Sequence, residues 1–212
     1  MTIILHDYFR SSASYRVRIA LNLKGLVYEQ RPVSLADGAQ HSNAYRTLNP
    51  QGFVPMLEMA GEKITQSLAI FDFLDSQVDQ PPFVPDDPSG RAHVLALALT
   101  IACDIHPLNN LRVLKYLKNP LGQDQAAADN WYRHWVTEGL TALEALARPR
   151  SGNFLYGDRV TMADICLVPQ LFNARRFETP LETFPTLLRA EANALAVPAF
   201  QAAHPDVQEV RS

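Results

Sequence analysis

A proline-rich stretch at residues 79–88 most constrains the fold of this 212-residue chain, because it separates two parts with different patterns. The stretch reads Asp-Gln-Pro-Pro-Phe-Val-Pro-Asp-Asp-Pro. Proline removes a backbone donor and clashes with the preceding helical turn, so neither a helix nor a strand continues through such a segment. We therefore expect a linker at residues 79–88, between a first domain at residues 1–78 and a second domain at residues 89–212.

The first domain alternates between short apolar runs and helical periodicity. A helix is expected from Ser12 to Lys24, ended by Gly25, and another begins at Ser67, which we expect to be its N-cap. Runs of strand character lie at residues 3–5, 27–31, 54–59 and 63–65. The order β-α-β followed by β-β-α is typical of a thioredoxin-like domain, in which helices cover a small mixed sheet.

The second domain is helical in pattern and poor in strand signals. Apolar periodicity runs along residues 91–116, with a break at Pro107, and again along residues 124–147. Thr161 and Asp164 predict a capping box that opens a third helix, which is apolar enough to lie in the centre of the domain. The expected fold class is therefore α/β plus all-α, with an N-terminal thioredoxin-like domain and a C-terminal helical bundle.

Composition excludes several classes of protein. Hydrophobic residues make up 47% of the chain and charged residues 19%, as in soluble globular proteins. A net charge of −3 argues against nucleic-acid binding. No apolar run approaches the ~20 residues that span a bilayer, and no leader precedes the first strand, so we expect a cytoplasmic protein without a membrane partner. Cys103 and Cys166 lack paired spacing, which predicts two core thiols, no disulfide and no metal site.

A serine-rich turn joins the first strand to the first helix. Ser11, Ser12 and Ser14 lie where backbone N–H groups and the helix dipole favour an anion, and Arg10 adds positive charge. Serine before a helix is often only a cap. A thiol held here would have its pKa lowered, because the dipole and a hydroxyl hydrogen bond favour the thiolate. The turn contains no cysteine, so a sulfur held here would have to come from a ligand.

Three motifs resemble those of zeta-class glutathione transferases, also called maleylacetoacetate isomerases. Residues 11–21 are similar to the signature S-S-C-x-W-R-V-R-I-A-L, except that Ala13 replaces its cysteine. Residues 104–115 resemble I-Q-P-L-Q-N-L-x-V-L-K, and residues 157–170 resemble G-D-x-V-T-M-A-D-x-C-L-V-P-Q. The resemblance runs from Leu5 to about Phe200 in the same motif order. It implies the glutathione-transferase fold and glutathione as the cofactor.

The resemblance also assigns roles in a glutathione site. It implies that Ser11 is the main partner of the thiolate, with Ser12 close by as the second catalytic candidate. Cofactor-binding roles fall on the backbone of Val54, before a proline that the family holds in the cis form, and on His41, Gln66 and Ser67. Ser67 and the N–H groups of its helix would bind the γ-glutamyl carboxylate of glutathione. His41 would reach the glycyl end, although a single loop histidine is more often a surface residue.

Further candidates lie in the second domain. The kink at Pro107 would aim His106, Asn110 and Arg112 into the cleft, although a solvated helix face is the alternative for Arg112. His106 stands where many family members have glutamine. A dicarboxylate substrate would be held by three arginines, whose guanidinium groups match carboxylates: Arg10, Arg112 and Arg176. The pattern N-A-x-R-F favours Arg176 over Arg175, either of which could simply complement the dipole at a helix end.

The resemblance implies a glutathione-dependent cis–trans isomerase. In that class the thiolate adds to the cis double bond of a maleyl compound, the bond rotates, and elimination returns the trans fumaryl isomer. Our leading hypothesis is the conversion of maleylacetoacetate to fumarylacetoacetate in tyrosine and homogentisate catabolism. Alternatives are maleylpyruvate isomerase of gentisate degradation, favoured by Ala13 and by the His106 form of its motif, and a general zeta-class glutathione transferase. A non-catalytic binding protein fits least, and the family predicts a homodimer.

Overall fold

The computed structural model describes residues 2–209 and consists of two compact units. One unit holds the chain through Phe83 together with the segment from Ala196 onward, and the other holds Val84–Leu195. The C-terminal segment therefore groups by its contacts with the N-terminal part of the chain. The expected domain boundaries at residues 78 and 89 stay a prediction.

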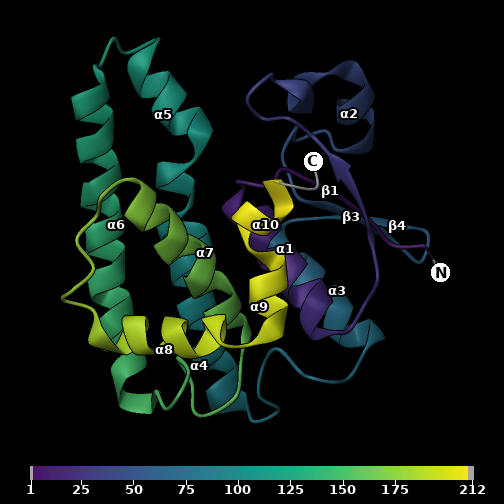
Figure 1. Ribbon diagram of the computed structural model, residues 1–212, viewed down its shortest axis with the longest axis vertical. Helices are drawn as coiled ribbons and strands as arrows, with labels where there is room; N and C mark the ends of the chain where they lie inside the picture. Colours follow the sequence, from purple (N-terminus) through teal and green to yellow (C-terminus); the bar gives the residue numbers. More distant parts are fainter. Residues whose placement is uncertain (1, 210–212) are drawn as a thin grey trace. The chain divides into compact units, whose positions relative to one another are not determined.

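A four-stranded mixed sheet forms the centre of the first unit (Figure 1). Its strands run in the order β2-β1-β3-β4, with β1 parallel to β2, and with β3 antiparallel to both β1 and β4. The elements of this part are β1 Ile4–Asp7, α1 Ser12–Leu23, β2 Glu29–Pro32, α2 Asn43–Leu48, β3 Met56–Met59, β4 Glu62–Thr65 and α3 Ser67–Gln77. The β-α-β and β-β-α order expected from the sequence is confirmed, and the thioredoxin-like layout with it.

Burial explains the position of each strand. Leu5, Met56 and Leu57 are fully buried, because β1 and β3 are the central strands, whereas β2 forms an exposed edge. Helix α1 ends as expected at Gly25, whose φ of 66° suits a residue without a side chain. Helix α2 was not expected, because a helix of six residues is too short to give apolar periodicity.

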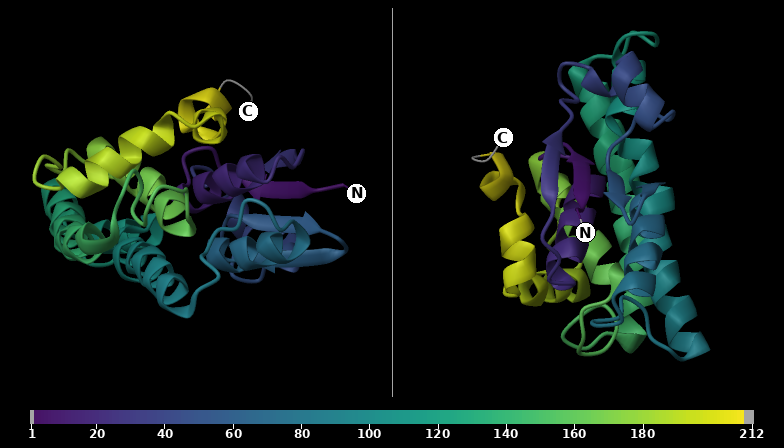
Figure 2. Two further views of the ribbon diagram at one scale, coloured as in Figure 1. Left: turned by 90° about the horizontal axis from the view of Figure 1, so that it is seen from below. Right: turned by 90° about the vertical axis from the view of Figure 1, so that its right-hand side faces the viewer.

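The last two helices of the chain complete the first unit. Helices α9 (Pro198–Ala203) and α10 (Pro205–Glu209) follow one another, and α9 lies beside α1 (Figures 1 and 2). Asn22 on α1 donates to the carbonyl of Ala199 at 3.0 Å, and Phe200 is fully buried. The chain thus returns to the helix that follows its first strand.

The second unit consists of helices. They are α4 Pro88–Leu99, a π-helical turn Thr100–Ile105, a 3-10 turn Pro107–Asn109, α5 Leu111–Lys118, α6 Gln125–Ala147, α7 Met162–Arg176 and α8 Pro185–Leu195. All residues of α7 from Met162 to Leu171 are buried, which confirms that this helix lies in the centre of the unit. Its neighbours in the unit include α4 and α8.

The break near Pro107 is wider than the sequence predicted. The α-helix ends at Leu99, and a new one begins only at Leu111, after Asn110 takes an extended conformation. Within residues 2–209, one helical stretch, residues 88–118, is long and apolar enough to cross a membrane by length and composition alone, because an 18-residue window in it has a mean hydropathy of 1.3. His93, Asp104 and His106 divide this stretch, so it is not a continuous apolar run, and its α-helix ends at Leu99.

Candidate functional site

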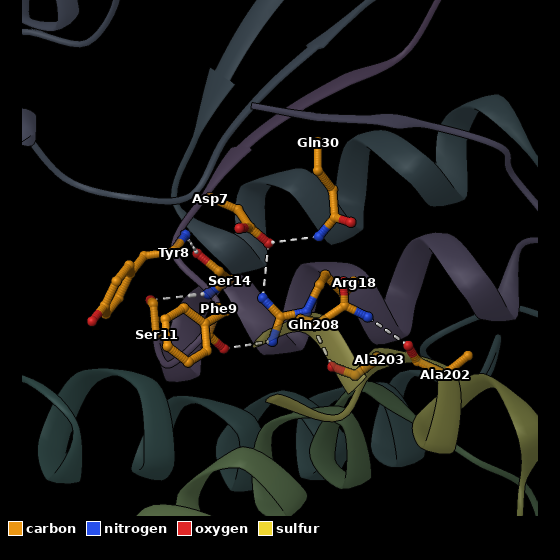
Figure 3. A network of polar contacts seen from close by, with 10 residues as sticks. All are labelled: Asp7, Tyr8, Phe9, Ser11, Ser14, Arg18, Gln30, Ala202, Ala203 and Gln208. Atoms are coloured by element: carbon orange, nitrogen blue, oxygen red, sulfur yellow. Dashed lines mark hydrogen bonds and ion pairs between the residues drawn. The ribbon is translucent and has the colours of Figure 1, made fainter. Parts of the chain in front are cut away.

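The serine turn lies at the start of α1, and its backbone is held in place by the serines (Figure 3). Ser11 is the N-cap: its Oγ accepts from the backbone N–H of Ser14 at 3.2 Å. The Oγ of Ser14, which is fully buried, accepts from the N–H of Tyr8 at 3.5 Å. The capping role that serine commonly has is therefore real for Ser11.

Capping does not use up the Ser11 hydroxyl. A serine Oγ carries one proton and two lone pairs, and Ser11 spends a lone pair on the Ser14 N–H. Its proton can therefore be donated to a ligand, and its side chain is partly exposed. Ser12 is only 5% exposed. These observations favour Ser11 over Ser12 as the donor to a bound thiolate.

A buried ion pair between Arg18 and Asp7 lies beside the serine turn (Figure 3). Arg18 is fully buried and donates to the Asp7 carboxylate at 2.8 Å, to the Phe9 carbonyl at 2.9 Å and to the Ala203 carbonyl at 3.1 Å. Gln30 adds a second donor to Asp7 at 3.3 Å. Arg18 thus connects the end of β1, the serine turn and α9. Sequence reasoning did not single out Arg18, whose carbonyl partner in α9 lies 185 positions away along the chain.

The start of α3 differs from the expectation. Ser67 is the first helical residue rather than the N-cap, which is Gln66 with φ 69° and ψ 117° and no capping hydrogen bond from its side chain. The Gln66 amide instead donates to the Gln51 side chain at 3.0 Å, and the Ser67 Oγ accepts from the Arg16 guanidinium at 3.4 Å. Ser67 is 6% exposed. The first N–H groups of α3 therefore receive no side-chain cap from Gln66, which leaves them suited to an anion.

The remaining candidates of the first unit lie on nearby loops. The Val54–Pro55 bond is cis, as the resemblance implied, and Val54 is 9% exposed. His41 is exposed, lies in a 3-10 turn at residues 39–41, and contacts the side chains of Gln40 and Arg46. Gly52 has a φ of 64°, and a Cβ there would stand 2.8 Å from the carbonyl oxygen of Gln40, so the turn beside His41 requires glycine.

Three candidates of the second unit lie around the helix break. His106 precedes the 3-10 turn and is half-buried, and Arg112 is exposed in the first turn of α5. Asn110 is the N-cap of α5, because its Oδ1 accepts from the N–H of Arg112 at 3.2 Å. The side-chain oxygen of Asn110 is therefore committed to its helix, while the amide nitrogen remains available as a donor.

The two arginines at the end of α7 have different environments. Arg175 forms a two-point ion pair with Glu191, with both nitrogen–oxygen distances at 2.5 Å. This pair raises the pKa of the Arg175 guanidinium. Arg176 is exposed, and its Nη1 donates to the Asn173 side chain at 3.0 Å. A guanidinium already paired with a carboxylate is poorly placed to bind another, which supports the choice of Arg176 over Arg175.

The chemistry open to these residues is anion binding. Within residues 2–209, no group of three or more His, Cys, Asp or Glu side chains is arranged to hold a metal ion. Cys166 is buried as expected, whereas Cys103 is exposed, so its interpretation as a core thiol is wrong. The predicted site residues fall in both units, with the serine turn, Val54 and the start of α3 in the first and His106, Asn110, Arg112 and Arg176 in the second.

Family models match both parts of the chain. Residues 5–82 match the glutathione S-transferase N-terminal domain, and residues 125–209 match the glutathione S-transferase C-terminal domain. A probable maleylacetoacetate isomerase of Vibrio cholerae is 45% identical over 98% of this chain and 98% of its own length. A maleylacetoacetate isomerase of Rhizobium meliloti is 46% identical over 96% of each chain.

Solved structures agree with this grouping. A holo maleylpyruvate isomerase, described as a bacterial zeta-class glutathione S-transferase, superposes with a TM-score of 0.94 at 41% identity, covering 97% of this chain and 98% of that one. The maleylacetoacetate isomerase of Anaeromyxobacter dehalogenans with glutathione in its active site gives 0.87 at 42% identity, covering 97% and 95%. That of Methylobacterium extorquens, with bound malonate and glutathione, gives 0.93 at 36% identity, covering 95% and 96%.

Proposed function

This chain belongs to the glutathione S-transferase family, and we propose that it is a zeta-class, glutathione-dependent isomerase that converts maleylacetoacetate to fumarylacetoacetate. The observation that carries the proposal is the pair of serine-bearing helix starts in the first unit. Ser11 offers a hydroxyl proton at the start of α1, and Ser67 stands at the start of α3, which lacks a side-chain cap from Gln66. A thiolate and a carboxylate, the two anionic ends of the cysteinyl and γ-glutamyl parts of glutathione, suit these two starts.

Bound glutathione supplies a thiolate that adds reversibly to the cis double bond of the substrate, so that the bond can rotate before elimination. The chain holds that sulfur as a thiolate, because the Ser11 proton and the positive end of the α1 dipole favour the charged form and lower the thiol pKa. Ser12 is the second candidate for this role. Ser11→Ala should raise the pKa of the bound thiol, read from thiolate absorbance against pH, more than Ser12→Ala does.

Binding of the rest of the cofactor follows from the same unit. The α3 N–H groups with Ser67 hold the γ-glutamyl carboxylate, and Gln66 lies beside them. The backbone of Val54 binds the cysteinyl residue, and His41 lies toward the glycyl end. His106 and Asn110 complete the proposed cofactor-binding set from the second unit.

The substrate is a small dianion held by Arg10, Arg112 and Arg176. All three side chains are exposed, and the relative with bound malonate holds a small diacid anion together with glutathione. Guanidinium groups bind carboxylates at two points and would also orient the double bond toward the sulfur. Arg112→Ala and Arg176→Ala should each raise the KM for the maleyl substrate while leaving glutathione affinity nearly unchanged. Full activity of the double alanine variant would overturn the clamp.

Maleylpyruvate is the second candidate substrate. It is favoured by the TM-score of 0.94 with the maleylpyruvate isomerase, by Ala13 and by the histidine at position 106. The two substrates share the maleyl group, so the same cofactor chemistry serves both.

The deciding experiment is an absorbance assay of the purified protein with each maleyl substrate, with and without glutathione. We expect isomerisation that requires glutathione, with the higher kcat/KM for maleylacetoacetate. Faster turnover of maleylpyruvate would reassign the substrate. Binding of glutathione without isomerisation of either compound would leave only a transferase or a binding protein.

The assembly and location belong to the same proposal. The family resemblance favours a homodimer in the cytoplasm. Light scattering at micromolar concentration should give twice the chain mass of 23.7 kDa. A particle of the single-chain mass would contradict the dimer without affecting the proposed chemistry.

A further inference from the structure

Arg16 lies beneath the start of α3 and has no part in the function proposed so far. It is on α1, one turn into the helix, and only 2% of it is exposed. Its Nη1 donates to the Ser67 Oγ at 3.4 Å. A fully buried guanidinium is costly to desolvate, so its hydrogen bond to Ser67 lies in a dry environment where a charge acts strongly.

The contact with Arg16 leaves the Ser67 hydroxyl proton available to a ligand. Arginine carries donors only, whereas a serine hydroxyl has one proton and two lone pairs. A Ser67 Oγ that accepts from Arg16 therefore keeps its proton for another partner. A hydroxyl proton at the first residue of α3 has the polarity that a carboxylate requires, and the wrong polarity for an ammonium group.

Charge adds to this directional effect. The first N–H groups of α3 carry roughly half a positive charge. The Arg16 guanidinium donates to the hydroxyl of Ser67, which is the first residue of the same helix. Because the guanidinium is buried, solvent screens it poorly, and its interaction with an anion at the helix start is stronger than on the surface. Both effects act on a carboxylate and not on a neutral group in the same place.

We propose that Arg16 is a positioning residue for the γ-glutamyl α-carboxylate of glutathione, acting through Ser67. It holds the Ser67 hydroxyl as a donor toward the ligand and adds a buried positive charge to the start of α3. The inference rests on the proposed function, in which Ser67 binds that carboxylate. It explains why the first arginine of the R-V-R sequence is buried under α3, while the second, Arg18, supports the serine turn.

The test compares two ligands by calorimetry: glutathione, and 4-aminobutyryl-cysteinyl-glycine, which is glutathione without the α-carboxylate. Arg16→Met should weaken glutathione binding by roughly tenfold, the lower part of the range for a hydrogen bond to a charged group. The same variant should change binding of the analogue less than about twofold. Arg16→Lys keeps the charge but not the guanidinium geometry, and should recover part of the loss.

Arg18→Met is the matched control, because Arg18 is buried on the same helix but contacts the serine turn instead of Ser67. It should weaken both ligands by the same factor. A merely structural Arg16 would give that same unselective result, which would overturn the inference. If Arg16→Met does not fold, Arg16→Gln and Arg16→Lys are compared with the same two ligands, and their folding is checked by thermal melting.

A double-mutant cycle separates this inference from the function on which it rests. In a Ser67→Ala background, Arg16→Met should cost less than tenfold in glutathione affinity, because the effect through the hydroxyl is gone and only the effect of the buried charge is left to lose. Full additivity would overturn the coupling between the two residues. If Ser67→Ala alone leaves glutathione affinity unchanged, the proposed carboxylate site itself is wrong, which is a different failure.

Discussion

The starts of helices α7 and α3 differ in how their first backbone N–H groups are capped. At α7 the side chain of Thr161 accepts from the N–H of Asp164, and the Asp164 carboxylate accepts from the Thr161 N–H at 2.8 Å. Asp164 also accepts from the Thr161 hydroxyl at 2.9 Å and from the Leu155 N–H at 2.8 Å, and it is fully buried. Every interaction at this start is made by the chain itself.

At α3 the residue in the capping position makes no such bond. Gln66 takes a left-handed conformation and contacts Gln51, while Ser67 accepts from Arg16. Free N–H groups at a helix start are stabilised by side chains, water or ligands. We therefore expect the start of α7 to serve stability and the start of α3, as proposed above, to bind a ligand, although both starts carry a hydroxyl residue in the sequence.

The largest expected effect is on the stability contributed by the capped start of α7. Asp164→Ala removes the acceptor of two backbone N–H groups in a dry environment, and each unsatisfied buried group costs about 1–3 kcal/mol. We expect the free energy of unfolding, measured by urea denaturation, to fall by about 3 kcal/mol or more. Glutathione affinity measured well below the unfolding transition should stay the same. A large loss of affinity without a loss of stability would reverse the assigned roles.

The same carboxyl should make stability depend on pH. Complete burial raises the pKa of Asp164 to about 6, against hydrogen bonds that lower it. The folded state then binds a proton more tightly than the unfolded chain, so this group's contribution to stability falls as pH rises from about 4 to about 6 and levels off above that. At ~1.4 kcal/mol per unit of pKa, the effect reaches at most about 3 kcal/mol.

Asp164→Asn supplies the reference for this pH effect, because it does not titrate. The difference in unfolding free energy between the native protein and this variant should shrink on going from pH 4 to pH 6. A difference that grows over this range would mean that the hydrogen bonds to the carboxylate outweigh the cost of burying its charge.

At the start of α3, glutathione binding should change more than the free energy of unfolding. Ser67→Ala should weaken glutathione binding by ~1.5–3 kcal/mol, the range for a hydrogen bond to a charged group. The unfolding free energy should fall by about 1 kcal/mol, less than for Asp164→Ala, since the hydroxyl caps no backbone group of α3 but does accept from the buried Arg16 guanidinium. Calorimetry and urea denaturation on one preparation give both values. A stability loss equal to the binding loss would remove the contrast with α7.

The two starts also mark how far the sequence could predict the site. The capping box at Thr161 was predicted, because hydroxyl and carboxyl residues three positions apart form a local signal. The role of Ser67 as an N-cap was wrong, because the left-handed conformation of Gln66 leaves no local trace in a sequence without glycine at that position. The contact between Arg16 and Ser67 joins residues 51 positions apart, which periodicity does not reveal.

The same limit applied to the fold. The order of strands and helices along the first unit and the central position of α7 followed from apolar patterns that repeat over several residues. The six-residue helix α2 was too short for such a pattern. The packing of α9 on α1 depends on single long-range bonds, such as that from Arg18 to the Ala203 carbonyl, and was not predicted.

The smallest expected effect concerns the backbone at Gln66. A residue with a side chain at φ 69° and ψ 117° is in a sparsely populated conformation that costs on the order of 1 kcal/mol or more, and glycine adopts it at lower cost. Gln66→Gly should therefore raise the free energy of unfolding by about 0.5–1 kcal/mol, once the greater freedom of glycine in the unfolded chain is subtracted.

Gln66→Ala is the control, because it also loses the amide contact with Gln51 but keeps the Cβ that causes the strain. The glycine variant should be the more stable of the two in urea denaturation, while both bind glutathione more weakly than the native protein. Equal stability of the two variants would mean that the backbone at Gln66 is not strained and that its conformation costs the folded state nothing.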